Sequence, residues 1–170
     1  MKNYTRPILF VFLILVLAII GNIIISTIGI FFNHDPFNTG VYASSYDLSL
    51  NIKLIFITKA IALTVFIIGT YVLISKLSYL VKGDFFNLIL IQSFQKSGRL
   101  FLLSGIVGFV ASIAGMLNLV VVKDFSSQAY LNIDSKSLYL MLMILGLFLL
   151  LFSKVLKRGG QLQTENDLTI

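Results

Sequence analysis

The sequence contains no cysteine, which excludes disulfide bonds, thiolate metal sites and lipid attachment at cysteine. Charge is also scarce: only 12% of the residues are charged, whereas soluble domains carry about a quarter. So small a charged fraction cannot cover a water-soluble surface. The formal net charge is +6, but its distribution along the chain favours a membrane surface as the partner. We therefore expect no direct binding of nucleic acid.

Residues that perform catalysis or hold metals are equally rare. The single histidine, His34, adjoins Asp35 and shares a loop with Asp47. Metal sites need three or four convergent ligands, so we favour a solvated loop over a metal site. The sequence has no Ser-His-Asp arrangement, no paired carboxylates and no glycine-rich phosphate motif. We expect neither catalysis nor a bound cofactor.

Long apolar runs are what the chain does have. Hydrophobic residues make up 58% of it, the mean hydropathy is +0.98, and four runs are each long enough for a membrane-spanning helix of about 20 residues. The first run is too long for a signal peptide, so we expect it to remain as a helix. These runs predict an all-α integral membrane protein, a four-helix bundle that forms one domain. The expected helices cover about 8–32, 54–74, 100–122 and 138–156, followed by a tail at 157–170.

The loop before the third run is too apolar to be solvated. Phe85, Phe86 and Ile89 lie in it, yet the stretch is short and is bounded by charges such as Asp84 and Arg99. It therefore cannot span a bilayer by itself. It predicts a short interfacial helix before the third long helix, or a helix that runs on into it.

The distribution of Lys and Arg predicts the orientation. With the N-terminus in the cytoplasm, nine of these residues lie on inner segments and three on outer loops, which satisfies the positive-inside rule. We therefore expect a multi-pass protein of the bacterial inner membrane, with both termini in the cytoplasm. The inner set is Lys2, Arg6, Lys76, Lys82, Lys96, Arg99, Lys154, Lys157 and Arg158, and the outer set is Lys53, Lys123 and Lys136.

Lys59 is the ionisable residue that lies well inside an apolar run, and charges in such positions are candidates for function. It is also within about a turn and a half of the outer end of its predicted helix. At that depth its ammonium group can extend to the interface. We favour this snorkelling interpretation, and a bound anion or a pairing with Asp47 remains the alternative.

Small residues recur along the first and third runs at spacings of three and four. Such stripes let helix backbones approach closely within lipid, and Asn22 is expected to form a hydrogen bond between helices. Packing within one chain is the favoured interpretation, and a homodimer interface is the alternative. The candidate packing residues are Gly21, Asn22, Gly105, Gly108, Ser112 and Gly115.

The tail that follows the fourth run is distinctive. Its cations stand where a helix end meets anionic headgroups, and its acids follow an expected break at Gly159 and Gly160. A simple polar tail does not explain why it closes on apolar Leu168 and Ile170. The distinctive residues are Arg158, Gly159, Leu162, Glu165, Asn166, Asp167, Leu168, Thr169 and Ile170.

A second distinctive block precedes the third run. Together, the two blocks resemble a bacterial membrane-protein family known as domain-of-unknown-function family 2975. The chain departs from that pattern at Leu90, where the family usually has asparagine, and around it, where a normally charged stretch is apolar. The second block consists of Gly83, Phe86, Asn87, Phe94 and Gly98.

The resemblance implies a four-helix protein of the bacterial inner membrane, often encoded beside a small helix-turn-helix regulator. It implies no reaction. The family-like residues gather on the expected cytoplasmic side, so we expect a non-enzymatic module that binds such a regulator there. The alternative is a small transporter or an immunity-type protein that blocks a membrane-active toxin.

Overall fold

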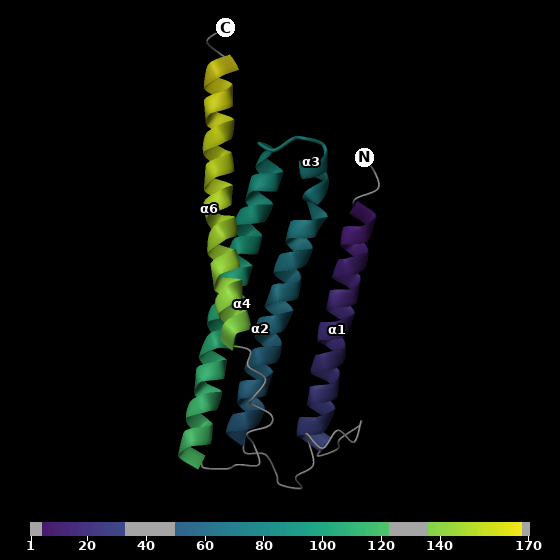
Figure 1. The fold of residues 1–170 in the computed structure, drawn as a ribbon, viewed down its shortest axis with the longest axis vertical. Coiled ribbons are helices and arrows are strands. Elements are labelled where there is room, and N and C mark those ends of the chain that lie inside the picture. The colour runs from purple at the N-terminus through teal and green to yellow at the C-terminus, as the bar shows by residue number, and fades with distance from the viewer. Residues whose placement is uncertain (1–4, 33–49, 123–135, 168–170) are drawn as a thin grey trace.

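The computed structural model describes residues 5–32, 50–122 and 136–167, and all its regular elements in these ranges are helices. Figure 1 shows the long helices side by side with nearly parallel axes. The beginning of α1 and the end of α6 lie at the same end of the molecule as α3, and α6 extends beyond the rest. The helices are α1 (Thr5–Phe32), α2 (Leu50–Ser75), α3 (Leu77–Val81), α4 (Leu88–Val122) and α6 (Lys136–Asp167).

The helices are suited to a membrane environment. Three stretches are long and apolar enough to cross one, namely Lys53–Leu80, Leu88–Leu117 and Lys136–Asn166. In α1, the apolar stretch is the shorter Pro7–Gly21. Large apolar side chains are exposed along each long helix, which a water-soluble monomer rarely tolerates over so wide an area.

Two serines hold α4 against α2. The Ser97 hydroxyl donates a hydrogen bond to the carbonyl oxygen of Gly69 (2.8 Å), and the Ser104 hydroxyl donates one to that of Ala62 (2.7 Å). The bonds repeat after seven residues on both helices, as expected for antiparallel helices that pack along a heptad seam. Both serines are completely buried, and each is satisfied by the backbone of the opposite helix.

Glycines bring α4 against α6. A Cβ atom on Gly98 would lie 2.9 Å from the carbonyl oxygen of Gly146, and one on Gly105 would lie 2.9 Å from that of Tyr139. Side chains at these positions would push the helices apart, so the close approach depends on their absence. The ring of Tyr139 lies over Gly108 and is almost fully buried.

The described residues do not confirm the predicted four-helix bundle. Helix α4 lies between α2 and α6, whereas α1 packs lightly, mainly against α2. Among the described residues, no heavy atom lies within 4 Å of the position that a Cβ on Gly21 of α1 would take, so its predicted packing role stays a prediction. The side chain of Asn22 lies outside the described residues.

The prediction of a separate short interfacial helix before the third long helix is wrong. Helix α4 begins at Leu88 and continues without interruption to Val122, because its N-terminal turns are buried against α2 and α6 at Leu90 and Phe94. The short helix that does precede it is α3, which lies earlier in the chain. The alternative that the apolar loop runs on into the third helix is the one realised.

The expected helix break at Gly159 and Gly160 is also wrong. Helix α6 continues through both glycines to Asp167, eleven residues beyond the predicted end at 156. Each glycine in a helix costs about 1 kcal/mol relative to alanine. Here the ring of Phe86 packs over the two glycines, and this contact offsets part of that cost.

Candidate functional site

A tight turn joins α3 to α4 at the end of the molecule where α6 protrudes. The amide of Gly83 donates to the Leu80 carbonyl (3.1 Å) and the amide of Asp84 donates to the Tyr79 carbonyl (3.1 Å), which is the Schellman pattern of a helix C-terminus. Gly83 adopts a φ of 80°, in the left-handed region that favours glycine. This requirement explains why a glycine stands at position 83.

Asn87 starts α4. Its side-chain oxygen accepts a hydrogen bond from the amide of Ile89 (2.9 Å), while its side-chain nitrogen donates to a carboxylate oxygen of Asp84 (2.8 Å). Asparagine is among the best residues at the N-cap of a helix, because it satisfies an amide that has no partner within the helix. The second family-like block thus builds a rigid corner at Gly83 and Asn87.

Replacing Asn87 with alanine should lower the free energy of unfolding by about 1 kcal/mol, because the amide of Ile89 would lose its acceptor. Hydrogen exchange of the first amides of α4 should accelerate by a corresponding factor. The matched control is Gln92→Ala, an exposed position in the next turn of the same helix. Equal exchange rates in the two variants would contradict the capping role.

Phe86 links this corner to α6. A Cβ on Gly159 would lie 2.6 Å from Cε1 of Phe86, and a Cβ on Gly160 would lie 3.3 Å from its Cβ. The aromatic ring therefore rests on a surface that only glycine leaves open. The two blocks that carried the family resemblance begin at Gly83 and Arg158, 75 residues apart in the sequence, and they are joined here at one end of the molecule.

Phe94 and Gly98, which belong to the same block, lie inside the helix packing. Phe94 is buried and meets Phe152 of α6 edge to face, with ring centroids 5.2 Å apart. Gly98 provides the close approach to Gly146 described above. These two residues support the end of the molecule from within, and they are not accessible to a partner.

The protruding part of α6 carries the accessible members of the first block. Arg158, Leu162, Glu165 and Asn166 are exposed, and Glu165 and Asn166 take part in interactions within the chain. Leu162 is apolar yet 55% exposed, and its neighbours in the sequence are polar. The side chain of Asp167 lies outside the described residues, as do Leu168, Thr169 and Ile170 in full.

Some residues that shape this assembly were not singled out from the sequence. Tyr139, Gly146 and Ser153 are all buried on α6 and are spaced by seven residues. That heptad spacing within an otherwise uniform leucine-rich run was the available signal. Of the predicted packing residues on α4, Gly105 and Gly108 contact α6, and Ser112 and Gly115 are buried.

Lys59 lies at the opposite end of the assembly from the α3–α4 turn. It is half-buried on α2 and makes no hydrogen bond or ion pair with the described part of the chain. Lys136, at the start of α6, is near enough to act on it electrostatically and donates a weak hydrogen bond to the sulfur of Met116 (3.5 Å). The segment that holds His34, Asp35 and Asp47 lies outside the described residues.

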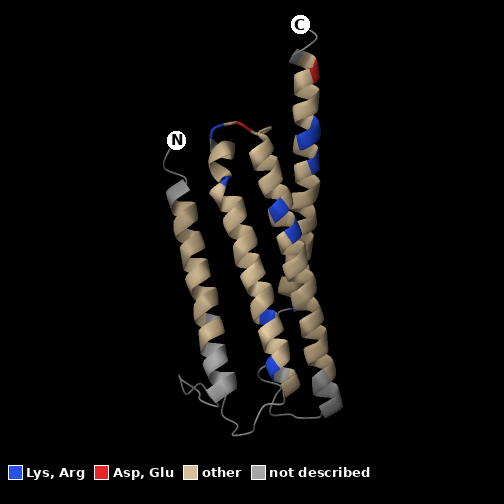
Figure 2. Ribbon diagram, turned by 180° about the vertical axis from the view of Figure 1, so that it is seen from behind, with Lys and Arg blue, Asp and Glu red and all other residues tan. Residues whose placement is uncertain are grey.

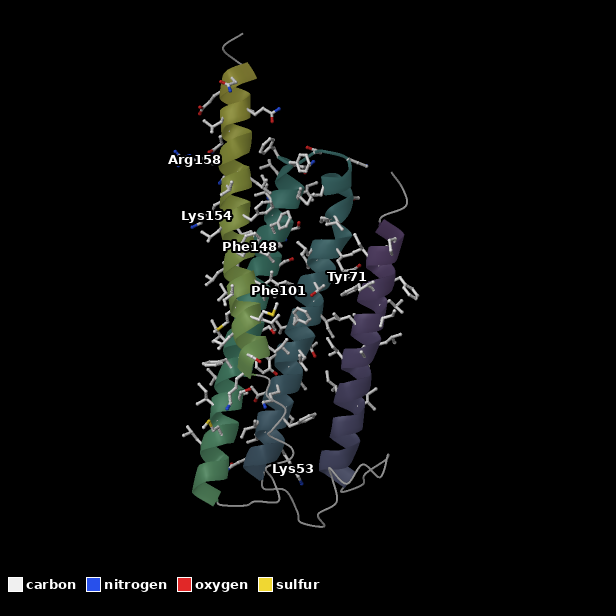
Figure 3. The ribbon with its side chains drawn as sticks, in the orientation of Figure 1. Lys53, Tyr71, Phe101, Phe148, Lys154 and Arg158 are labelled. Atoms are coloured by element: carbon white, nitrogen blue, oxygen red, sulfur yellow. The ribbon has the colours of Figure 1, made fainter. Side chains whose placement is uncertain are left out.

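The charged residues are unevenly placed. Figure 2 shows Lys and Arg along α4 and α6 toward the end where α6 protrudes, with few acidic residues among them. Figure 3 shows Lys154 and Arg158 pointing away from the other helices, and Lys53 at the opposite end of the molecule. The candidate functional site is therefore the surface formed by the α3–α4 turn and the exposed end of α6, which we call the turn–α6 surface.

No protein-family model matches the chain, and comparisons with curated proteins and with solved structures also found no match.

Proposed function

We propose that this chain is a non-enzymatic, multi-pass protein of the bacterial inner membrane, related to domain-of-unknown-function family 2975. In this proposal all four long helices cross the bilayer and both ends of the chain face the cytoplasm. The turn–α6 surface binds a small helix-turn-helix transcriptional regulator and holds it at the membrane. Release of the regulator would then change the expression of its target genes.

The observation that supports the proposal most directly is the contact between Phe86 and the glycines of α6. It joins two segments that are far apart in the sequence into one surface at one end of the molecule. The Schellman turn at Gly83 and the cap at Asn87 hold Phe86 in place. A preorganised surface loses little conformational entropy on binding, which favours recognition of a partner.

The shape of α6 supports a protein partner. Its last turns extend beyond the other helices, so most of their circumference is open (Figure 1). They carry the exposed apolar side chain of Leu162 and, on the same face of the helix, the exposed polar side chains of Glu165 and Asn166. An apolar anchor surrounded by polar groups is the usual composition of a protein-binding surface.

Transport and toxin immunity remain weaker candidates. A transport pathway needs polar groups that face a common passage through the membrane. The hydroxyl groups of Ser97 and Ser104 are instead occupied by backbone carbonyls of α2, and those of Ser93 and Ser153 by carbonyls of their own helices. Ser97 and Ser104 therefore hold α4 against α2, and none of the four hydroxyl groups favours transport.

Capture experiments test the proposed regulator binding. The triple variant Leu162→Ser, Glu165→Ala, Asn166→Ala changes only exposed positions. We expect tagged protein from native membranes to lose a bound DNA-binding regulator on the order of tenfold, because an anchor of this kind is worth about that much or more. The matched control is the double variant Gln161→Ala, Gln163→Ala, with exposed positions on the same turns.

Reporter expression supplies the second readout. Loss of capture should be accompanied by a changed expression of the genes that the regulator controls, and the control variant should match the parent in both measurements. Far-UV circular dichroism establishes that all variants keep their helices. If the triple variant retained the regulator at the parental level, or if the parent captured none, the proposal would be abandoned.

A further inference from the structure

The contacts between helices define the relative depth of their charged residues. Ser97 of α4 lies at the same level as Gly69 of α2, to which it is hydrogen-bonded. Gly98 of α4 lies at the level of the Gly146–Leu150 turn of α6, which it contacts. Lys154 follows Leu150 by four residues, so it lies about 6 Å further toward the end where α6 protrudes.

Two cations of α4 lie deeper than this. Lys96 and Arg99 flank Gly98 in the sequence, so Arg99 lies about 8 Å closer to the centre of the assembly than Lys154 does. By the same count from the Ser97–Gly69 hydrogen bond, Arg99 is about 13 Å deeper than Lys76, which directly follows α2. If Lys76 and Lys154 mark the inner boundary of the bilayer at α2 and α6, then Lys96 and Arg99 of α4 lie below that boundary.

These cations face outward and lack a described counter-charge. Lys96, Arg99 and Lys154 are exposed, and none of them makes a hydrogen bond or ion pair within the described part of the chain. Among side chains that the structure describes, the carboxylates are those of Asp84, which binds Asn87, and Glu165, eleven residues beyond Lys154 on α6. Figure 2 shows the basic residues of α4 and α6 toward the end of the molecule where α6 protrudes.

The surface below the cations is apolar. Leu103, Ile106 and Val110 continue the same face of α4 and are 52%, 48% and 59% exposed. A ligand that fits this arrangement has an anionic group at one end and a long apolar chain at the other. Nucleic acids and phosphopeptides have no such chain, whereas an anionic phospholipid has both parts in the required order.

We propose that Lys96, Arg99 and Lys154 form a binding site for the phosphate group of an anionic phospholipid, whose acyl chain lies along Leu103, Ile106 and Val110. The phosphate neutralises cations that would otherwise be held below the headgroups without a partner. The site lies on the outer face of α4 and α6, and it does not depend on whether the turn–α6 surface binds a regulator.

Native mass spectrometry of the full-length protein tests this site. The protein is released from a mixture of phosphatidylcholine, phosphatidylglycerol and cardiolipin, and the retained lipids are counted. We expect a preference for the anionic lipids over phosphatidylcholine. Each cation removed should weaken the preference for anionic lipids about fivefold. The double variant Lys96→Gln, Arg99→Gln should therefore weaken this preference about 25-fold.

Two matched variants separate a charge effect from a structural one. Arg99→Lys keeps the charge and should retain the anionic lipid. The double variant Lys53→Gln, Lys136→Gln removes two cations at the opposite end and should also retain it. Loss of lipid in either of these variants would overturn the proposal, as would unchanged retention in Lys96→Gln, Arg99→Gln.

Inorganic phosphate distinguishes a lipid site from a site for the free anion. Added at tens of millimolar, it should leave the lipid bound, because the acyl chain contributes apolar contacts that the free ion cannot replace. Displacement of the lipid by phosphate alone would assign the site to the free anion and would overturn the proposed lipid. Equal retention of phosphatidylcholine and the anionic lipids would overturn it as well.

Discussion

Replacing Gly146 with alanine should destabilise the packing of α4 against α6, whereas replacing Gly21 with alanine should not. A Cβ atom on residue 146 would lie 2.7 Å from the amide nitrogen of Leu102 and 2.8 Å from the carbonyl oxygen of Gly98. Both are backbone atoms, so the strain can be relieved only by moving one helix away from the other. Such overpacking costs about 1–3 kcal/mol in well-packed interiors.

Steric-trap or denaturant unfolding in bicelles measures this difference as a free energy of unfolding. Gly21→Ala is the matched control, because the same substitution is made in a long apolar helix where the new Cβ meets no atom within 4 Å. It should be neutral or slightly stabilising, since alanine has the higher helix propensity. Equal effects at the two positions would show that the glycines of α4 and α6 do not determine the helix separation.

Replacing Tyr139 with alanine should have the largest effect of any single truncation in the chain. Tyr139 is 2% exposed, is among the largest fully buried side chains, and clusters with Leu142 of its own helix and Ala62 of α2. Removing a buried aromatic side chain of this size costs about 3 kcal/mol or more in soluble proteins. We expect a loss of this order in the free energy of unfolding.

A double-mutant cycle with Gly108→Ala isolates the contact between Tyr139 and α4. In the parent, a Cβ on residue 108 would collide with the Tyr139 ring, so Gly108→Ala should be destabilising. In the Tyr139→Ala background the ring is gone, and the same substitution should become nearly neutral. The coupling should therefore fall in the range of about 0.5–3 kcal/mol found for residues in contact. Additive effects would mean that the Tyr139 ring does not lie over Gly108.

The elements that the sequence predicted best are the long apolar helices. The predicted bounds at 8–32 and 54–74 differ by a few residues from α1 (Thr5–Phe32) and α2 (Leu50–Ser75). Apolar run length is a local property of the chain, and a run of this length has few ways other than a helix to satisfy its backbone in an apolar environment. For that reason the all-helical class followed from the sequence alone.

The errors occurred where a local signal opposed a distant contact. Gly159 and Gly160 favour a helix end when they are considered with their neighbours in the sequence, yet α6 continues through them. Phe86, more than 70 positions earlier, packs on the flat surface that these glycines leave. No property of residues 157–167 by themselves indicates that an aromatic ring will lie there.

The candidate site shows the same division. The sequence drew attention to Gly83, Phe86 and Asn87 through a resemblance, but it did not assign different tasks to them. The structure gives Gly83 the left-handed turn, Asn87 the helix cap and Phe86 the contact to α6. These tasks depend on backbone dihedral angles and on contacts between segments, neither of which a one-dimensional pattern contains.

The sequence by itself determined that this protein is helical, that its helices are apolar enough for a membrane, and that its basic residues gather toward one end. Composition and run length set these properties, because burial in lipid and the placement of charge depend on residue type more than on contacts with other segments of the chain. Only the tertiary structure decided that α4 lies between α2 and α6, and that Lys96 and Arg99 lie deeper than Lys154. The register of neighbouring helices is set by a few close contacts between small residues, and these contacts exist only once the chain has folded.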